Sequence, residues 1–300
     1  LEASAYLMEK IQKSAEFGIK VENAVFDFSK VMERKENTVK LLRSGVEALL
    51  KSNNIDMVKG QGFVLDDKTV EIKESKEIIE YKNLIIATGA NFYLPKSLQG
   101  NDPDKAEEKT TMNCCSEGSC CGEATKQPEN ILTAKDMLSI SEIPKNLLVI
   151  GGGAIGCEFS SIFSAFGTKI TIVELENRLL PNMDEDISKE ITRSFKKKNI
   201  KIYAGKKVLN LKNTEEGVLA EIEDLEQQVF DKVLISAGVK PAIDFFNKNK
   251  LNLEITDNNF IKIDNTCKTN IDNIYAVGDV TGVLMLAHTA YYQAEIAVSN

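Results

Sequence analysis

The chain has 300 residues, which is enough for about two domains with buried cores. Hydrophobic residues make up 43% and charged residues 27%, as in a globular protein, and the net charge is −8 at pH 7. This acidic balance excludes a general nucleic-acid binder, and the apolar runs are too short to span a membrane. No targeting segment is recognised, and six cysteines without a signal peptide indicate reduced thiols, so we expect a cytoplasmic protein.

The first 90 residues change from helical to β periodicity. Two amphipathic helices are predicted within residues 1–51, with a break at Gly18 and a second helix start at Asp27. Short apolar runs bounded by polar turns then predict strands. These strands span residues 55–58, 62–65, 69–72, 78–81 and 83–90, the last of which runs into a glycine turn.

Residues 95–129 differ in composition, with few large apolar side chains, and predict a long loop or insertion. Four cysteines lie here: Cys114, Cys115, Cys120 and Cys121. Four thiolates so close together could hold a soft metal ion such as Zn(II), Cu(I), Hg(II) or As(III), although adjacent pairs depart from the usual zinc spacing. A regulatory dithiol switch and a reduced loop with no fixed role are the two alternatives.

Residues 147–158 predict a buried strand, a glycine turn and the start of a helix. The turn has the spacing Gly-x-Gly-x-x-Gly. Gly151 would permit the tight turn, Gly153 would let the backbone approach a pyrophosphate, and Gly156 would let the helix pack on the strand. Glu174 ends the next predicted strand, where its carboxylate would bind ribose hydroxyls and repel a 2′-phosphate, which favours NAD. The alternative is a glycine turn that binds nothing.

The rest of the chain alternates between the two periods. An amphipathic helix is predicted from Asp184 to Lys198, and a last helix from about Leu286. Further strands are predicted at residues 200–203, 217–222, 228–230, 232–238 and 273–279.

A second pair of strand ends suggests another ligand site. Residues 85–89 and 275–279 both place small residues at the carboxyl end of a strand, where α/β sheets bind ligands. Asp279 offers a carboxylate to a polyol hydroxyl, and the helix that starts near Leu286 would favour negative charge on a ring system, as on a reduced flavin. Strand packing alone is the alternative for both segments.

The order and spacing of five segments resemble the pyridine nucleotide-disulfide oxidoreductases. The segments are Ala-Thr-Gly at 87–89, Gly-Gly-Gly-Ala-Ile-Gly-Cys-Glu at 151–158, Glu174, Ser-Ala-Gly-Val-Lys-Pro at 236–241 and Tyr-Ala-Val-Gly-Asp at 275–279. The resemblance implies an α/β fold with two Rossmann-like dinucleotide-binding domains. Residues 1–94 and 268–300 would form a partial FAD domain, interrupted by an NAD domain at 130–267, with 95–129 as the cysteine-rich insertion.

The same resemblance assigns cofactor contacts by position. Those for FAD would be Gly60 and Gly62 near the adenine, Ala87, Thr88, Gly89, Gly278, Asp279 at the ribitol, and Leu286, Ala287 and His288 near the ring. Those for NAD would be Gly151, Gly153, Ala154, Ile155, Gly156, Glu174 and Gly238. Glu158 matches a glutamate that pairs with a lysine near the flavin. Ala154 stands where some relatives carry a tyrosine that gates the nicotinamide pocket.

The sequence also departs from the family pattern. It lacks the glycine-rich unit and the Cys-x-x-x-x-Cys pair that open the family sequence, and the histidine–glutamate pair that closes it. We therefore expect an interior fragment, inactive alone, of a homodimeric enzyme that oxidises a small or lipoyl-domain dithiol through FAD to NAD, with a 2-oxo acid dehydrogenase complex as a possible partner. The alternatives are an NADH-dependent reductase of disulfides, peroxide, mercuric ion or another metal ion, and a non-catalytic nucleotide- or metal-binding module.

Overall fold

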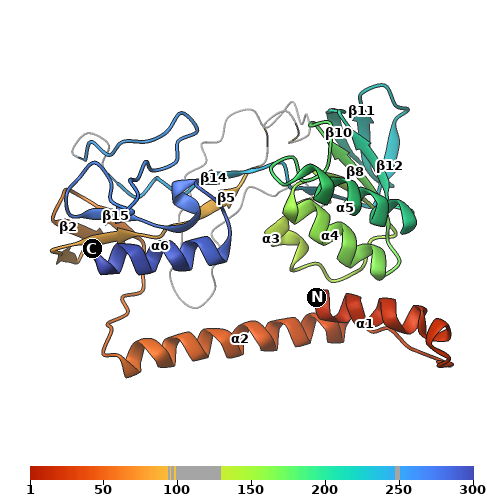
Figure 1. Ribbon diagram of the computed structural model, residues 1–300, viewed down its shortest axis with the longest axis horizontal. Coiled ribbons are helices and arrows are strands. Elements are labelled where there is room, and N and C mark those ends of the chain that lie inside the picture. Colours follow the sequence, from red (N-terminus) through yellow and green to blue (C-terminus); the bar gives the residue numbers. More distant parts are fainter. Residues whose placement is uncertain (94, 96–97, 99–129, 247–250) are drawn as a thin grey trace. The chain divides into compact units, whose positions relative to one another are not determined.

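The computed structural model describes residues 1–93, 95, 98, 130–246 and 251–300. The four clustered cysteines lie outside these residues. The described residues form two compact units (Figure 1). Unit 1 consists of Leu1–Asp56, Tyr93 and the described residues from 95 to 238, and unit 2 of Met57–Phe92 and the described residues from 239 to 300.

Unit 1 is built on a parallel sheet with the strand order β6-β13-β7-β8-β9. The strands are β6 (Ile131–Thr133), β7 (Asn146–Ile150), β8 (Lys169–Glu174), β9 (Lys201–Ala204) and β13 (Lys232–Ile235). Successive side chains of β7 point to opposite faces of the sheet. Leu147 and Val149 face one core and Leu148 and Ile150 another, and all four are buried. Burial on both faces explains the uninterrupted apolar run in this strand.

The two faces of this sheet are covered by different structures. Helices α3 (Ala134–Met137), α4 (Ala154–Ala165) and α5 (Glu185–Lys197) supply the first core through Met137, Phe163 and Phe195. The opposite face packs against an antiparallel sheet of β10 (Val208–Thr214), β11 (Gly217–Ile222) and β12 (Gln228–Phe230). The sequence predicted a helix from Asp184 to Lys198; in the structure Asp184 is the N-cap of α5, and its carboxylate accepts a hydrogen bond from the Asp186 amide at 2.8 Å.

The N-terminal helices of unit 1 agree with prediction. They are α1 (Glu2–Gln12), the short 3₁₀ helix η1 (Ser14–Phe17) and α2 (Phe28–Ser52), which Asp27 caps through the Lys30 amide at 3.2 Å. Helix α1 packs against α4 and carries Glu9, which pairs with Lys198. Much of α2 is exposed, including Leu41 at 73% and Leu42 at 66%.

Unit 2 contains three small sheets. Strands β1 (Gly62–Val64), β2 (Thr69–Ile72) and β3 (Ile78–Glu80) are antiparallel, β4 (Leu84–Ile86) pairs in parallel with β15 (Ile274–Ala276), and β5 (Ala90–Phe92) pairs antiparallel with β14 (Val239–Pro241). The 3₁₀ helix η4 (Gly278–Thr281) and helix α6 (Ala287–Ser299) follow β15. A shared core includes Val64, Ile86, Phe246 and Ile274.

One predicted strand is wrong. Residues 55–58 form no strand, and three of their side chains, Ile55, Met57 and Val58, are about half exposed. An apolar run without a partner strand leaves its backbone groups unpaired, so it does not become a strand by composition alone. The compact units divide the described residues at 238 and group 1–56 with 130–238. The predicted bounds of the cofactor domains, 1–94 with 268–300 and 130–267, stay predictions. Which cofactor each unit holds stays a prediction.

Within the described ranges, no helix is both long and apolar enough to cross a membrane.

Candidate functional site: two strand-end turns

The glycine turn follows β7 in unit 1, where the sequence predicted it. Gly151 has a φ of +106°, a backbone conformation that favours glycine, and a Cβ there would lie 2.6 Å from the Ser236 carbonyl oxygen. A Cβ on Gly156 would collide with the Gly151 carbonyl oxygen and lie 2.8 Å from Ser236 Oγ. Ser236 in turn donates its hydroxyl to the carbonyl oxygens of Ile150 at 3.1 Å and Gly151 at 3.0 Å. Both glycines are therefore required by close packing inside unit 1.

Gly153 has a different environment from its two neighbours in the motif. It is the N-cap of α4, no side chain caps this end of the helix, and a Cβ on Gly153 would meet no atom within 4 Å. Ala154 is exposed and Ile155 half-buried in the first turn. A helix start with uncapped N–H groups and open space in front of it can receive an anionic group such as a phosphate.

Glu174 ends β8 and is only 7% exposed. Its carboxylate accepts a hydrogen bond from the Gly152 amide and another from the Glu176 amide at 2.8 Å. The acid that the sequence predicted at this position thus lies beside the turn and fixes one of its peptide groups. Contact between this carboxylate and a ribose stays a prediction.

Cys157 and Glu158 lie on the first turns of α4 and face different surroundings. Cys157 is buried and its thiol donates to the Gly152 carbonyl oxygen at 3.4 Å. Burial, with smaller contributions from the negative charges of Glu174 and Glu158, raises the pKa of the Cys157 thiol to about 12. Glu158 is exposed, and its pairing with a lysine stays a prediction.

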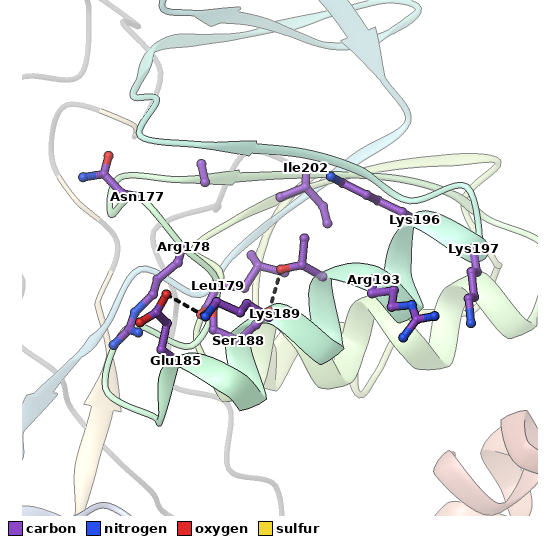
Figure 2. Close-up of a pocket in the computed structure, with 12 residues that line it drawn as sticks. Asn177, Arg178, Leu179, Glu185, Ser188, Lys189, Arg193, Lys196, Lys197 and Ile202 are labelled. Carbon is purple, nitrogen blue, oxygen red and sulfur yellow. Dashed lines mark hydrogen bonds and ion pairs between the residues drawn. The ribbon is translucent and has the colours of Figure 1, made fainter.

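A groove of about 660 Å³ is lined by residues of α5, β9 and the segment 177–179 (Figure 2). Basic side chains dominate its rim: Arg178, Lys189, Arg193, Lys196 and Lys197. Two of them form ion pairs, Lys189 with Glu185 at 2.9 Å and Arg193 with Glu190 at 3.8 Å. The sequence did not predict this groove.

The second candidate turn belongs to unit 2 and is more exposed. The parallel pairing of β4 with β15 brings residues 87–89 and 277–279 to the same edge, and the Val277 amide donates to the Ile86 carbonyl oxygen at 2.9 Å. Ala87 and Thr88 are exposed, and the Thr88 hydroxyl donates to the Ala242 carbonyl oxygen at 2.8 Å. Gly89 has a φ of +70° with open space at its Cβ position.

The remainder of this turn joins η4 to α6. The Gly278 amide donates to Gln293 Oε1 at 2.7 Å, and Gln293 is buried. Sequence reasoning missed Gln293, whose only signal was a polar residue inside an apolar helix. Asp279 is half-buried, whereas Leu286, the N-cap of α6, and the next two residues, Ala287 and His288, are exposed.

Gly60, Gly62 and Gly238 are less closely tied to either turn. Gly60 has a φ of +149°, and a Cβ there would lie 2.6 Å from Ile72 Cγ2 and 2.7 Å from Glu74 Oε2. Local packing just before β1 therefore explains why residue 60 is a glycine. Gly238 has a φ of +118° with no atom within 4 Å of a Cβ position. Their predicted cofactor contacts stay predictions.

The chain is similar to curated proteins along nearly its whole length. The chain is 34% identical over 296 residues to the dihydrolipoyl dehydrogenase of Bacillus subtilis, and the match covers 96% of this chain and 57% of that protein. It is 31% identical to the dihydrolipoyl dehydrogenase of Geobacillus stearothermophilus, covering 98% and 58%. The chain thus spans less than two thirds of the length of these curated relatives.

Solved structures share the fold, and a sequence profile shows the family. The flavoprotein disulfide reductase RclA of Escherichia coli, solved as a cysteine-to-serine mutant in a Cu(II) complex, matches with a TM-score of 0.77 and 26% identity, over 91% of this chain and 57% of that one. LpdA of Mycobacterium tuberculosis shares the fold, with a TM-score of 0.81 and 21% identity, over 99% and 60%. A sequence profile described as "Pyridine nucleotide-disulphide oxidoreductase" matches residues 5–294. The chain therefore belongs to the pyridine nucleotide-disulphide oxidoreductase family.

Proposed function

We propose that this chain is part of a dihydrolipoyl dehydrogenase, a flavoprotein that passes two electrons from a dithiol through FAD to NAD. The observation that carries the proposal is the uncapped start of α4 behind the glycine turn, with open space at Gly153 and the buried Glu174 beside it. The dithiol substrate is favoured by the 34% identity to a dihydrolipoyl dehydrogenase. The activity is proposed for the whole protein, because the chain spans 57% of that relative.

In this proposal unit 1 holds NAD, which would accept the electron pair as a hydride. The N–H groups at the start of α4 and the helix dipole would bind the pyrophosphate. Glu174 would face the adenosine ribose and repel a 2′-phosphate, so NAD is preferred over NADP. The residues concerned are Gly151, Gly153, Ala154, Ile155, Gly156, Glu174 and Gly238.

Unit 2 would hold FAD, which supplies two-electron exchange with a dithiol. The exposed start of α6 would favour negative charge on the ring, and Asp279 would bind the ribitol. On the family resemblance, Glu158 would pair with a lysine. The remaining contacts of unit 2 would be Gly60, Gly62, Ala87, Thr88, Gly89, Gly278, Leu286, Ala287 and His288.

The balanced reaction converts two thiols into one disulfide. Two electrons and one proton leave as the hydride that NAD accepts, and the second proton goes to solvent. The substrate would be a small dithiol or a lipoyl domain, including that of a 2-oxo acid dehydrogenase complex. We also propose a homodimer, on the family resemblance, and a cytoplasmic location, because the buried free thiols Cys157 and Cys267 fit a reducing compartment.

The second candidate is an NADH-dependent disulfide reductase. It is favoured by the 26% identity and TM-score of 0.77 to the Escherichia coli disulfide reductase. In this case the electrons travel in the opposite direction, from NADH through FAD to a disulfide.

Kinetics on the full-length protein can separate these functions. If the protein is a dihydrolipoyl dehydrogenase, we expect rapid reduction of NAD by dihydrolipoamide, slow reduction of NADP, and the visible absorbance of bound flavin. A preference for NADH-driven reduction of other disulfides, with little activity on dihydrolipoamide, would support the second candidate. If neither NAD nor NADH bound and no flavin were present, both functions would be ruled out.

A further inference from the structure

Leu180 has an unusual backbone conformation for an aliphatic residue. Its φ is +50°, in the left-handed region that disfavours side chains with a Cβ. The other described non-glycine residues with positive φ are four asparagines, an aspartate, a lysine and a cysteine. A strained leucine persists only where its surroundings hold it in place, and such strain gathers at functional sites.

The surroundings of Leu180 do hold it in place. We call residues 178–183 the Leu180 loop. Arg178 Nη2 donates to the carbonyl oxygens of Pro181 at 2.9 Å and Met183 at 3.1 Å, and the Met183 amide donates to the Leu180 carbonyl oxygen at 2.9 Å. From α5, the buried Ser188 hydroxyl donates to the Leu179 carbonyl oxygen at 2.6 Å (Figure 2). The loop is therefore fastened both within itself and to the helix.

The outcome of this arrangement is a hydrogen bond to the glycine turn. The Leu180 amide donates to the Gly152 carbonyl oxygen at 2.8 Å, while the Gly152 amide donates to Glu174. The side chain of Leu179 lies directly against Gly152, since a Cβ on Gly152 would be 2.5 Å from Leu179 Cδ2. Gly152 is thus held on both of its peptide groups, between Gly151, which makes the tight turn, and Gly153, whose backbone would approach the pyrophosphate.

We propose that the Leu180 loop is a positioning element for the nucleotide turn, and that Ser188 and Leu180 are its positioning residues. With the unfavourable φ at Leu180, the N–H group of this residue is directed toward the Gly152 carbonyl oxygen. This fixes the turn, and with it the start of α4, in the conformation that receives the dinucleotide before the dinucleotide arrives, which lowers the ordering cost of binding. The inference rests on the proposed NAD function of this site.

The test compares two buried hydroxyls in unit 1 of the full-length protein. Ser188→Ala removes the bond from α5 to the loop. Thr168→Val removes a matched bond, from a buried hydroxyl to the Pro144 carbonyl oxygen at 2.8 Å, and Thr168 is not part of the loop or the turn. We expect both variants to unfold at a similarly lower urea concentration. Only Ser188→Ala should weaken NADH binding, by roughly fivefold in a fluorescence titration, the scale of one hydrogen bond.

Leu180→Gly is the second variant, and it decides the outcome if Ser188→Ala does not fold. Glycine accepts the φ of Leu180 without strain but leaves the loop free to move, so NADH affinity should again fall by roughly fivefold. In turnover, the KM for the dinucleotide should rise in each loop variant while kcat stays within about twofold.

Three results would overturn the inference. If the wild type binds NADH and both loop variants bind it equally well, the inference fails while the proposed function stands. If Thr168→Val weakens binding as much as Ser188→Ala, the effect is general loss of stability, and the inference also fails. If the wild type binds no NADH, the proposed function and the inference fail together.

Discussion

The two strand-end turns differ in how much of their surroundings the chain itself provides. In unit 1, the sites of Gly151, Gly152 and Gly156 are enclosed by Ser236, Leu179 and Glu174. In unit 2, Ala87, Thr88 and the first residues of α6 are exposed, as are the four apolar side chains that precede the helix, Val283, Leu284, Met285 and Leu286.

The glycine turn of unit 1 is therefore held in place by residues of its own unit, whereas the turn of unit 2 is not. A preorganised turn should bind its ligand without further ordering, whereas an exposed turn needs other groups to complete it. We therefore expect residues 1–300 alone to bind NADH while holding FAD weakly. Equilibrium dialysis of the chain against each cofactor checks this. Tight FAD binding together with undetectable NADH binding would contradict the conclusion that only the unit 1 turn is preorganised.

The largest predicted effect concerns Cys157, which is enclosed behind the unit 1 turn. Because its thiol has a pKa of about 12, against an ordinary value of 9.0, its thiolate fraction at pH 8 is lowered. Alkylation should be roughly a thousandfold slower than for a free cysteine. Peptide mapping after iodoacetamide treatment, with and without urea, measures this rate. Rapid labelling of Cys157 in the native protein would show that the turn is open.

The same pKa difference makes stability depend on pH at the alkaline end. The folded pKa is raised above the unfolded one, so the contribution of the protonated thiol to stability is complete below about pH 9 and is lost as the pH rises toward 12. A Cys157→Ala variant should lack this part of the alkaline decline in urea denaturation curves.

Gly156→Ala should give the largest loss of stability among the substitutions in the turn. Its Cβ would collide with Gly151 and approach Ser236 Oγ to 2.8 Å. The backbone of α4 or of the turn after β7 would have to shift, so we expect a loss of about 3 kcal/mol in the free energy of unfolding. Urea denaturation measures it.

Gly153→Ala is the matched control for that substitution. A Cβ there meets nothing within 4 Å, and the φ of −72° suits alanine. The free energy of unfolding should change by less than about 0.5 kcal/mol. NADH affinity should nevertheless fall by about tenfold, since the methyl group occupies the space proposed for the pyrophosphate. Unchanged affinity would contradict the proposed site.

Glu174→Gln tests the support of the turn by a buried acid. The amide keeps one acceptor, but its NH₂ group would face the donor of Gly152 or Glu176. An unsatisfied buried donor should lower the free energy of unfolding by about 2 kcal/mol. The preference for NADH over NADPH should also narrow in the same variant, and titration with both nucleotides reports it. If stability and preference were both unchanged, Glu174 would have neither role.

Gly89→Ala should have the smallest effect, because the unit 2 turn leaves space for a side chain. The cost is the φ of +70° alone, which amounts to about 1 kcal/mol. Thermal or urea unfolding of the chain compares it with Gly156→Ala. A loss as large as that of Gly156→Ala would remove the contrast between the two turns.

The sequence predicted those parts of the fold whose signals are local. Four consecutive apolar residues indicated β7, and Asp184 with a helical apolar stripe indicated α5. Strands β5, β6 and β14 were missed because none of them contains more than two consecutive apolar residues, so their pairing with distant strands left no local signal. Strand β10 was missed because its register shifts between Val208 and Asn210, which breaks the alternation that marks a strand.

The same distinction holds for the candidate site. The motif located the glycines and Glu174, whose spacing is encoded within one strand–turn–helix–strand unit. Ser236 opens the segment 236–241, but the motif gave it no role, and Gln293 lies in no motif. Ser236 reaches the turn from 85 residues away, and Gln293 reaches Gly278 from 15 residues away on another element. Side chains that complete a turn from another element leave no local pattern.

The position of Ser236 also has a consequence for how the molecule assembles. Strand β13 lies between β6 and β7, although Ser236, just beyond its end, is 85 residues from Gly151. Closing so long a segment costs chain entropy, so the neighbouring strands β7, β8 and β9 can pair earlier than β13 can join them. In this order of assembly the nucleotide turn would be completed only when β13 joins the sheet. A dinucleotide present during refolding should therefore act on the final step of assembly, and by binding only the finished sheet it should protect the protein from proteolysis.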